Sequence, residues 1–157
     1  MCEYCGCQSL ASIDELTREH DEVVRLISQL RPAHDNGDVA RMATSPTRSP
    51  PCSTLTPASR STACSPMAAD FPEQIAALEA EHRRIESVLA EAADGVTPSD
   101  PTRPDRLMEA MAMLRNHILK EQDGVFPAAL AGLGTEEWEA VEKVRVEAGS
   151  ALPPPAA

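Results

Sequence analysis

Residues 107–127 read LMEAMAMLRNHILKEQDGVFP, and this stretch decides the fold. Its apolar residues recur every three or four positions, a spacing that draws one stripe along an α-helix. The stripe consists of Leu107, Met111, Leu114, Ile118 and Val125. Beside it lie His117 and Glu121, which are four positions apart and therefore share one helix face. The stretch predicts an amphipathic helix that ends near Phe126-Pro127 and presents an imidazole and a carboxylate together.

Two further helices are predicted upstream by the same spacing. The first begins at Ser12, because Ser12-Ile13-Asp14-Glu15 has the S-x-x-E form of a capping box, and it ends near Pro32. Its stripe consists of Ile13, Leu16, Val23, Ile27 and Leu30. The second begins near Asp70, with Pro72 in its first turn, and stops at Asp94-Gly95. Its stripe consists of Ile75, Leu78, Ile85 and Leu89.

Length and composition fit a helical bundle. The chain has 157 residues, 42% of them hydrophobic, and a net charge of −11. Such acidity argues against nucleic-acid binding, and no apolar run approaches the roughly 18 residues of a membrane span. A shorter helix is expected from Thr135 to about Ala148, packed through Trp138, Val141 and Val144. We expect an all-α protein, an antiparallel four-helix bundle at residues 12–148, between a cysteine-bearing segment at 1–11 and a Pro/Ala tail at 149–157.

One internal stretch departs from this composition. Thr44–Pro66 holds six Ser, five Thr and five Pro, with no acidic residue and no His. Such a segment cannot bury enough apolar surface to offset the entropy lost on ordering. We therefore expect this segment to be disordered.

Histidines interrupt the apolar stripes of the three long helices. His20 fills the gap in the first stripe, His82 fills the gap in the second, and His117 with Glu121 lies beside the third. A single His on an apolar face is more often a hydrogen-bonded core residue, but three helices that each carry one predict a common site. Neutral imidazoles and a carboxylate that converge inside a bundle suit a first-row transition metal. His34 follows Pro32, and we expect it to be solvated in a loop.

The chain repeats itself at an offset of 82 − 20 = 62 residues. Glu19-His20 and Glu81-His82 are each followed by a similar set of Val, Leu and Ile residues. If the bundle consists of two helix pairs, the partner of His117 falls near position 117 − 62 = 55. That position lies inside Thr44–Pro66, which supplies neither a His nor a carboxylate.

These residues resemble the hemerythrin-like (HHE cation-binding) family, a four-helix bundle with a non-haem di-iron centre. In that family the first and third helices each give one His, and the second and fourth each give an H-x-x-x-E pair. His117…Glu121 followed by Gly124-Val125-Phe126-Pro127 matches the fourth-helix motif, and His82 and His20 match the third and first helices. The resemblance covers roughly Ser12 to Ala148 and fails from Thr44 to Pro66, so it implies that the second helix of the bundle is disrupted or disordered.

A shifted reading frame offers an explanation for the failure. With GC-rich codons, the bases of Thr54–Pro66, read from one base earlier, can encode D-P-H-T-R-V-E-E-H-G-L-F-P. This contains H-x-x-x-E followed by G-L-F-P, and its His straddles the codons of Leu55 and Thr56, where the repeat places it. Two compensating insertions or deletions would then have scrambled the second helix and made Cys52 and Cys64 by-products. The alternative is a genuine flexible insertion; the coding DNA decides between them.

The resemblance implies iron as the cofactor, two ions in an intact relative and one or none here. The half-site of His82, His117 and Glu121 survives, whereas the other half keeps only His20. The family handles oxygen, nitric oxide or peroxide, or senses iron or redox state, so a diatomic ligand is the expected partner. No residue stands apart as a general acid or base. We expect a binding or sensing protein more than an enzyme.

The N-terminal Cys2, Cys5 and Cys7 allow another interpretation. In a cytosolic chain a C-x2-C-x-C cluster favours metal or redox chemistry, but three thiolates are one ligand short of a closed zinc site. A cytoplasmic location is expected, because the first residues lack the basic and apolar regions of a signal peptide. Two alternatives stay open: a metal-free helical interaction module, and a thiol-based redox or zinc-binding protein that uses these cysteines.

Overall fold

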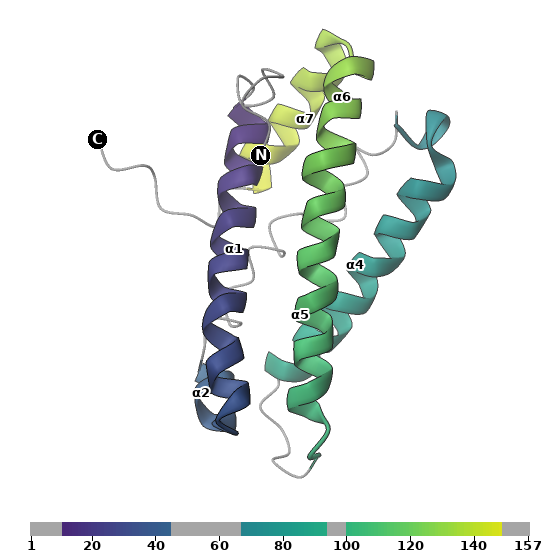
Figure 1. Cartoon of the computed structure of the whole chain (residues 1–157). Helices are drawn as coiled ribbons and strands as arrows, with labels where there is room; N and C mark the ends of the chain where they lie inside the picture. The colour runs from purple at the N-terminus through teal and green to yellow at the C-terminus, as the bar shows by residue number, and fades with distance from the viewer. Residues whose placement is uncertain (1–10, 45–66, 94–99, 149–157) are drawn as a thin grey trace, which may run out of the picture.

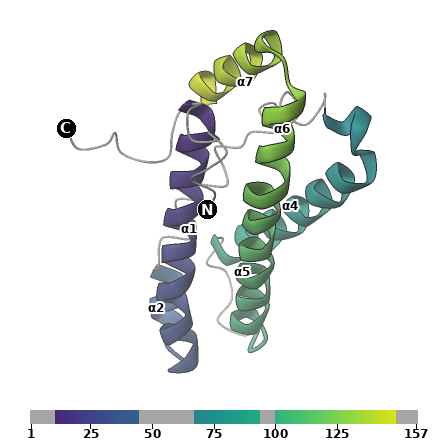
Figure 2. The ribbon, with the colours of Figure 1, turned by 45° about the horizontal axis from the view of Figure 1, so that its top comes forward.

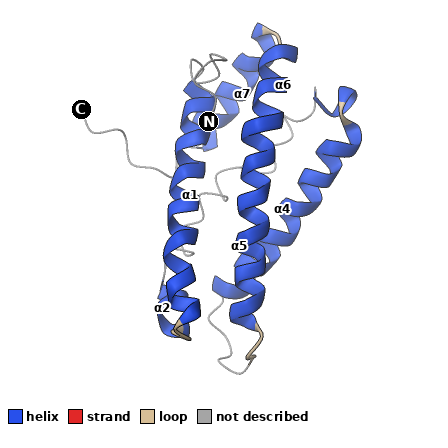
Figure 3. Cartoon of the chain, in the orientation of Figure 1, coloured by secondary structure: helices blue, strands red, loops and turns tan. Residues whose placement is uncertain are grey.

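The computed structural model describes residues 11–44, 67–93 and 100–148, and within these ranges the chain is helical with no strand (Figure 3). The all-α fold class is therefore confirmed. The helices are α1 (Ala11–Asp35), α2 (Val39–Thr44), α4 (Pro72–Ala93), α5 (Arg103–Lys120), a π-helical turn η4 (Glu121–Val125), α6 (Phe126–Gly132) and α7 (Thr135–Ala148). The expected site of the disrupted helix, residues 45–66, lies outside the described ranges, and so do the N-terminal cysteines and the tail.

Three long helices form the body of the molecule (Figure 1). α5 packs against both α1 and α4 and runs antiparallel to each of them. At its N-terminal end α4 leans away from α5, as two views show (Figures 1 and 2). The short α7 crosses from the end of α6 to the N-terminal turns of α1 (Figure 2). The arrangement is that of an antiparallel bundle in which α1 and α4 run in the same direction.

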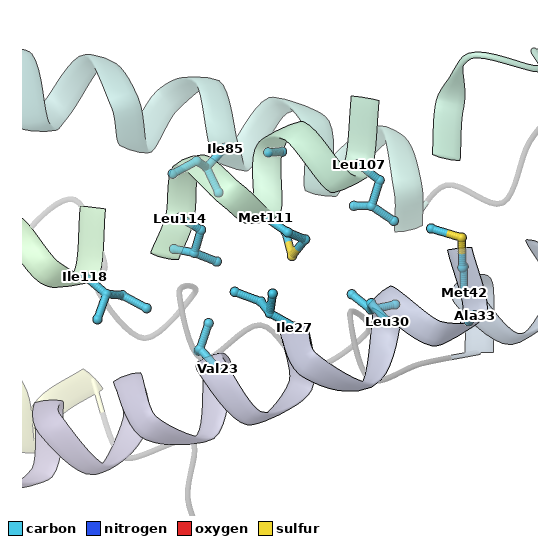
Figure 4. Close-up of a cluster of buried hydrophobic side chains, with 11 residues drawn as sticks. Val23, Ile27, Leu30, Ala33, Met42, Ile85, Leu107, Met111, Leu114 and Ile118 are labelled. Carbon is cyan, nitrogen blue, oxygen red and sulfur yellow. The ribbon is translucent and has the colours of Figure 1, made fainter. Parts of the chain in front are cut away.

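The hydrophobic core lies mainly between α1 and α5 (Figure 4). Val23, Ile27 and Leu30 of α1 face Leu107, Met111, Leu114 and Ile118 of α5, and Ile85 joins them from α4. These are the stripe residues expected from the sequence. Burying each large aliphatic side chain contributes roughly 1.5–3 kcal/mol. The packing therefore fixes which faces of the three helices point inward.

The ends of α1 differ from expectation. Pro32 lies inside the helix, which continues to Asp35. It ends in a Schellman motif: the Asp38 N–H donates to the Ala33 carbonyl and the Gly37 N–H donates to the His34 carbonyl, both at 2.8 Å. Gly37 adopts a φ of 65°, which glycine reaches without steric cost. The prediction that Pro32 ends α1 is wrong, because the buried Ala33 and this motif hold one more turn.

The expected capping box at the start of α1 is also absent. Ser12 lies inside α1, and its hydroxyl donates to the Glu142 carboxylate of α7. Glu15 accepts a hydrogen bond from Arg145 of α7 at 3.2 Å. The two residues of the presumed box therefore face a helix that is distant in sequence, a use that local spacing does not reveal.

The helix that carries His117 does not end at Phe126-Pro127. After Lys120 the chain widens into the π-helical turn η4, and α6 then continues to Gly132. The Phe126 N–H donates to the Glu121 carbonyl, five residues back. Pro127 lies in the first turn of α6, where its missing N–H is tolerated. By contrast, the predicted bounds of α7, Thr135–Ala148, are confirmed. Val141 is buried, and Trp138 packs on a second, smaller cluster of buried side chains formed by Met67, Ile75 and Ala129.

Candidate metal centre

The three stripe histidines come together at the end of the bundle near α7. His20 projects from α1, His82 from α4 and His117 from α5, and all three are buried, His117 with 1% of its surface exposed. Glu121 follows His117 by one turn and begins the π-helical turn. π-helical turns occur frequently at functional sites, because the wider turn re-aims the side chains around it.

The Glu121 carboxylate lies at the centre of the cluster. Its Oε1 is 3.2 Å from Nε2 of His117 and 3.9 Å from Nε2 of His82. Its Oε2 is 3.1 Å from Nε2 of His20. The two oxygens therefore face different histidines: Oε1 faces His82 and His117, and Oε2 faces His20.

One subset of these residues meets the geometric requirement for a shared cation. His82, His117 and Glu121 each offer one ligand atom, and these atoms lie within 4.8 Å of one another. The imidazole rings of His82 and His117 are in contact, with centroids 4.0 Å apart and planes tilted by 51°. His20 stands on the other side of Glu121, where its ring stacks on Phe126 at 5.8 Å with nearly parallel planes.

The charges at the cluster are coupled. Burial opposes ionisation of Glu121, but the adjacent imidazoles of His117 and His20 outweigh it and lower the pKa of Glu121 far below its usual range. Burial also opposes protonation of His117, yet the Glu121 and Glu81 carboxylates raise its pKa above the ordinary value. An ionised carboxylate that is only 14% exposed and faces three imidazoles is an attractive environment for a cation.

Two buried ring nitrogens of the cluster are without a hydrogen-bond partner among the described residues. They are Nδ1 of His20 and Nε2 of His117. Nε2 of His117 lies near Glu121, but its geometry is not that of a hydrogen bond. Leaving a buried polar atom unsatisfied costs about 1–3 kcal/mol. A metal ion accepting the lone pairs of His117 and Glu121 removes that cost, so the donor set fits a transition metal.

A second layer of residues supports His117. Its Nδ1 lies 3.0 Å from Oε2 of Glu81, on α4, and the other oxygen of Glu81 accepts a hydrogen bond from the Lys120 ammonium of α5. The Lys120 hydrogen bond is the main reason that the pKa of Glu81 is lowered. Sequence reasoning noted Glu81 only as the residue before His82. Its contact with His117 depends on the packing of α4 against α5, which no local pattern encodes.

α7 is attached to α1 beside the cluster. The Arg145 guanidinium, with 4% of its side chain exposed, lies between two carboxylates of α1. Its Nη2 is 2.5 Å from Oε1 of Glu19, whose side chain is 3% exposed, and its Nε is 3.2 Å from Oε2 of Glu15. Glu19 directly precedes His20. The ion pairs therefore fix the turn of α1 that carries this histidine, and sequence reasoning missed Arg145.

The prediction that His34 lies in a loop is wrong. It lies in the last turn of α1, and its Nε2 is 2.8 Å from Oδ1 of Asp105 on α5. This hydrogen bond to Asp105, with a smaller contribution from Asp35, raises the pKa of His34. The pair lies beyond the core from the metal cluster, so His34 is not part of it. Cys2, Cys5 and Cys7 lie outside the described residues.

An apolar cavity of about 620 Å³ lies next to the cluster, between the first turns of α4 and the η4–α6 segment. Most of its wall is apolar, with Phe71, Ile75 and Val125 among the lining residues. Lys120, the partner of Glu81, also lines it. The cavity therefore borders the residue that contacts Glu81.

Comparison with known proteins gives one match. Residues 56–129 match the family model "Hemerythrin HHE cation binding domain". The matched region contains His82, His117 and Glu121, whereas His20 lies before it. No curated protein and no solved structure matches the chain. In the described part of the chain, none of the helices has the length and apolarity to cross a membrane.

Proposed function

Because residues 56–129 of this chain match the hemerythrin HHE cation-binding domain, we propose that the protein binds non-haem iron at His82, His117 and Glu121. The observation that carries the proposal is the convergence within 4.8 Å of three ligand atoms, two from buried histidines and one from a Glu121 side chain that is 14% exposed. Two imidazoles and one carboxylate form a ligand set that non-haem iron accepts while keeping open coordination positions. The unsatisfied Nε2 of His117 supports the same assignment.

We propose that the chain holds one metal far more tightly than a second. A second ion beside the first would have Oε2 of Glu121 and Nε2 of His20 as ligands within the described residues. Two ligands hold an ion weakly, and close cations need more than one bridging carboxylate to offset their repulsion. In a singly loaded protein His20 donates from Nε2 to Glu121 and so keeps the carboxylate in place.

When bound, the iron supplies redox chemistry and open positions for a diatomic ligand such as oxygen or nitric oxide. The residues of this chain hold and orient the ion: His117 is fixed by Glu81, Glu121 is fixed by His20, and the apolar core excludes water from one side. Since each titratable group at the cluster is already a ligand or a partner of a ligand, we propose binding or sensing over catalytic turnover, in the cytoplasm.

The test is metal analysis and absorption spectroscopy of the purified protein with three variants. We expect about one iron per chain in the wild type, none in His117→Ala, and wild-type content in Cys5→Ala. His34→Ala is the matched control, because this histidine lies outside the cluster and its loss should leave the iron in place. Circular dichroism establishes that each variant is folded.

Each other outcome contradicts this proposal or supports a different function. Two tightly bound irons per chain contradict the single-metal proposal. Loss of metal in Cys5→Ala alone supports a thiol-based redox or zinc site. A folded wild-type protein that takes up no iron when reconstituted supports a metal-free helical interaction module.

A further inference from the structure

Glu81 connects the candidate metal cluster to the protein surface. One of its oxygens lies 3.0 Å from Nδ1 of His117, and the other accepts a hydrogen bond from Lys120. The exposure of the three side chains increases in that order of connection: 1% for His117, 26% for Glu81 and 53% for Lys120. A buried imidazole is thus linked, through a single carboxylate, to a charge in contact with solvent.

We propose that Glu81 and Lys120 are positioning residues that tune the metal affinity of His117 in opposite directions. This inference rests on the proposed function, since it assumes that Nε2 of His117 is a metal ligand. Neither residue touches the ion. Glu81 strengthens His117 as a ligand, and Lys120 limits that effect.

The action of Glu81 follows from its charge and position. An ionised carboxylate can only accept, so Nδ1 of His117 is the protonated nitrogen and Nε2 keeps its lone pair for the metal. A negative partner on Nδ1–H also increases the basicity of the ring, and such partners typically change metal affinity 10- to 100-fold. Glu81 therefore fixes the ring orientation, the tautomer and the electron donation together.

Lys120 opposes this because it shares the same carboxylate. Its ammonium draws negative charge toward the other oxygen of Glu81 and weakens the hydrogen bond to His117. The Lys120 side chain is half exposed, so solvent screens its charge and its effect is smaller than that of Glu81. Removing Lys120 should therefore strengthen His117 as a ligand.

A purely structural role predicts something different. If Glu81 and Lys120 only join α4 to α5, removing either one loosens the same helix contact, and both substitutions lower metal affinity. Changes in metal affinity of opposite sign are expected only if the charge of Lys120 acts on His117 through the Glu81 carboxylate. The sign of the Lys120 effect therefore separates the two explanations.

The experiment compares Glu81→Gln and Lys120→Met in the full chain. Fe²⁺ affinity is measured by competition with a chelator, and the Fe³⁺/Fe²⁺ potential by spectroelectrochemistry. We expect Glu81→Gln to weaken Fe²⁺ binding about tenfold and to raise the potential. We expect Lys120→Met to tighten binding about threefold, the scale of an exposed ion pair, and to lower the potential. Glu73→Gln and Arg115→Met, exposed charges on the same two helices, are the matched controls.

Shifts of the same sign in both variants, or a potential within the range of the controls, overturn the proposal while leaving iron binding intact. If Glu81→Gln does not fold, Lys120→Met decides alone: a lowered potential supports the proposal, and an unchanged or raised one contradicts it. A wild-type chain that binds no Fe²⁺ contradicts both this inference and the proposed function.

Discussion

Replacing Arg145 by methionine should destabilise the protein by about 3 kcal/mol. Arg145 and Glu19 are 4% and 3% exposed, so the substitution removes the guanidinium next to a buried carboxylate. Removing one member of a buried ion pair typically costs about 3–5 kcal/mol. The lower end applies here, because Glu15, the other carboxylate, is 32% exposed and is hydrated without Arg145.

The assay is urea unfolding followed by far-ultraviolet circular dichroism, at one iron concentration for all variants. With a slope of about 2 kcal/mol/M, a loss of about 3 kcal/mol lowers the midpoint by about 1.5 M. Lys143→Met is the matched control, because Lys143 is exposed on the same helix, and it should shift the free energy of unfolding by less than about 0.5 kcal/mol.

A double variant makes the explanation specific. Glu19→Gln combined with Arg145→Met leaves no buried charge of this pair, so it should be more stable than the sum of the two single losses predicts. Strictly additive losses, or an Arg145→Met variant as stable as the control, would refute the view that this ion pair attaches α7 to α1.

Two further predictions concern the opposite end of α1. The raised pKa of His34 means that its pairing with Asp105 stabilises the fold fully below the unfolded pKa of about 6.5, and that this contribution disappears as the pH rises through the higher folded pKa. The stability difference between wild type and His34→Gln should therefore be larger at about pH 5.5 than at about pH 9 in urea titrations; a constant difference contradicts the pairing. Gly37→Ala should lower the free energy of unfolding by about 1 kcal/mol, because alanine is strained at a φ of 65° although a Cβ meets no atom there. Gly37→Asn should cost less, since asparagine tolerates this conformation better. Equal losses of stability for the two variants in a thermal melt would argue against a backbone origin.

Local periodicity was sufficient for the helices and for the residues proposed as ligands. The stripes of α1, α4 and α5 predicted most of the buried apolar residues, although Leu16, Leu78 and Leu89 are only partly buried. His20 and His82 filled gaps in their stripes, and His117 and Glu121 lay beside theirs. A residue's face on a helix depends on its neighbours three and four positions away, and the sequence displays these directly. Binding of iron at His82, His117 and Glu121 stays a prediction, and so does a role for His20 in a second, weaker site.

Helix ends were predicted less well, because a helix end depends on several competing interactions and a proline is only one of them. Pro32 and Pro127 both indicated an end, yet α1 continues into a Schellman motif at Gly37 and the helix of His117 continues through the π-helical turn into α6. At Pro32 the packing of the buried Ala33 outweighs the missing N–H, whereas Pro127 lies in the first turn of α6, where a missing N–H is tolerated. The cause of the anomalous Thr44–Pro66 composition belongs to the coding DNA, and residues 45–66 lie outside the described structure.

The sequence by itself determined that this is a helical bundle in which each long helix carries a histidine on or beside its apolar stripe. Amphipathic spacing and the i, i+4 pair of His117 and Glu121 are local properties, so the sequence displays them directly. Only the tertiary structure decided how those groups are used. It placed His20 and the α4–α5 pair on different oxygens of Glu121, brought Glu81 to His117, and set Arg145 against Glu19. These contacts join residues far apart in the chain, and their geometry follows from how whole helices pack.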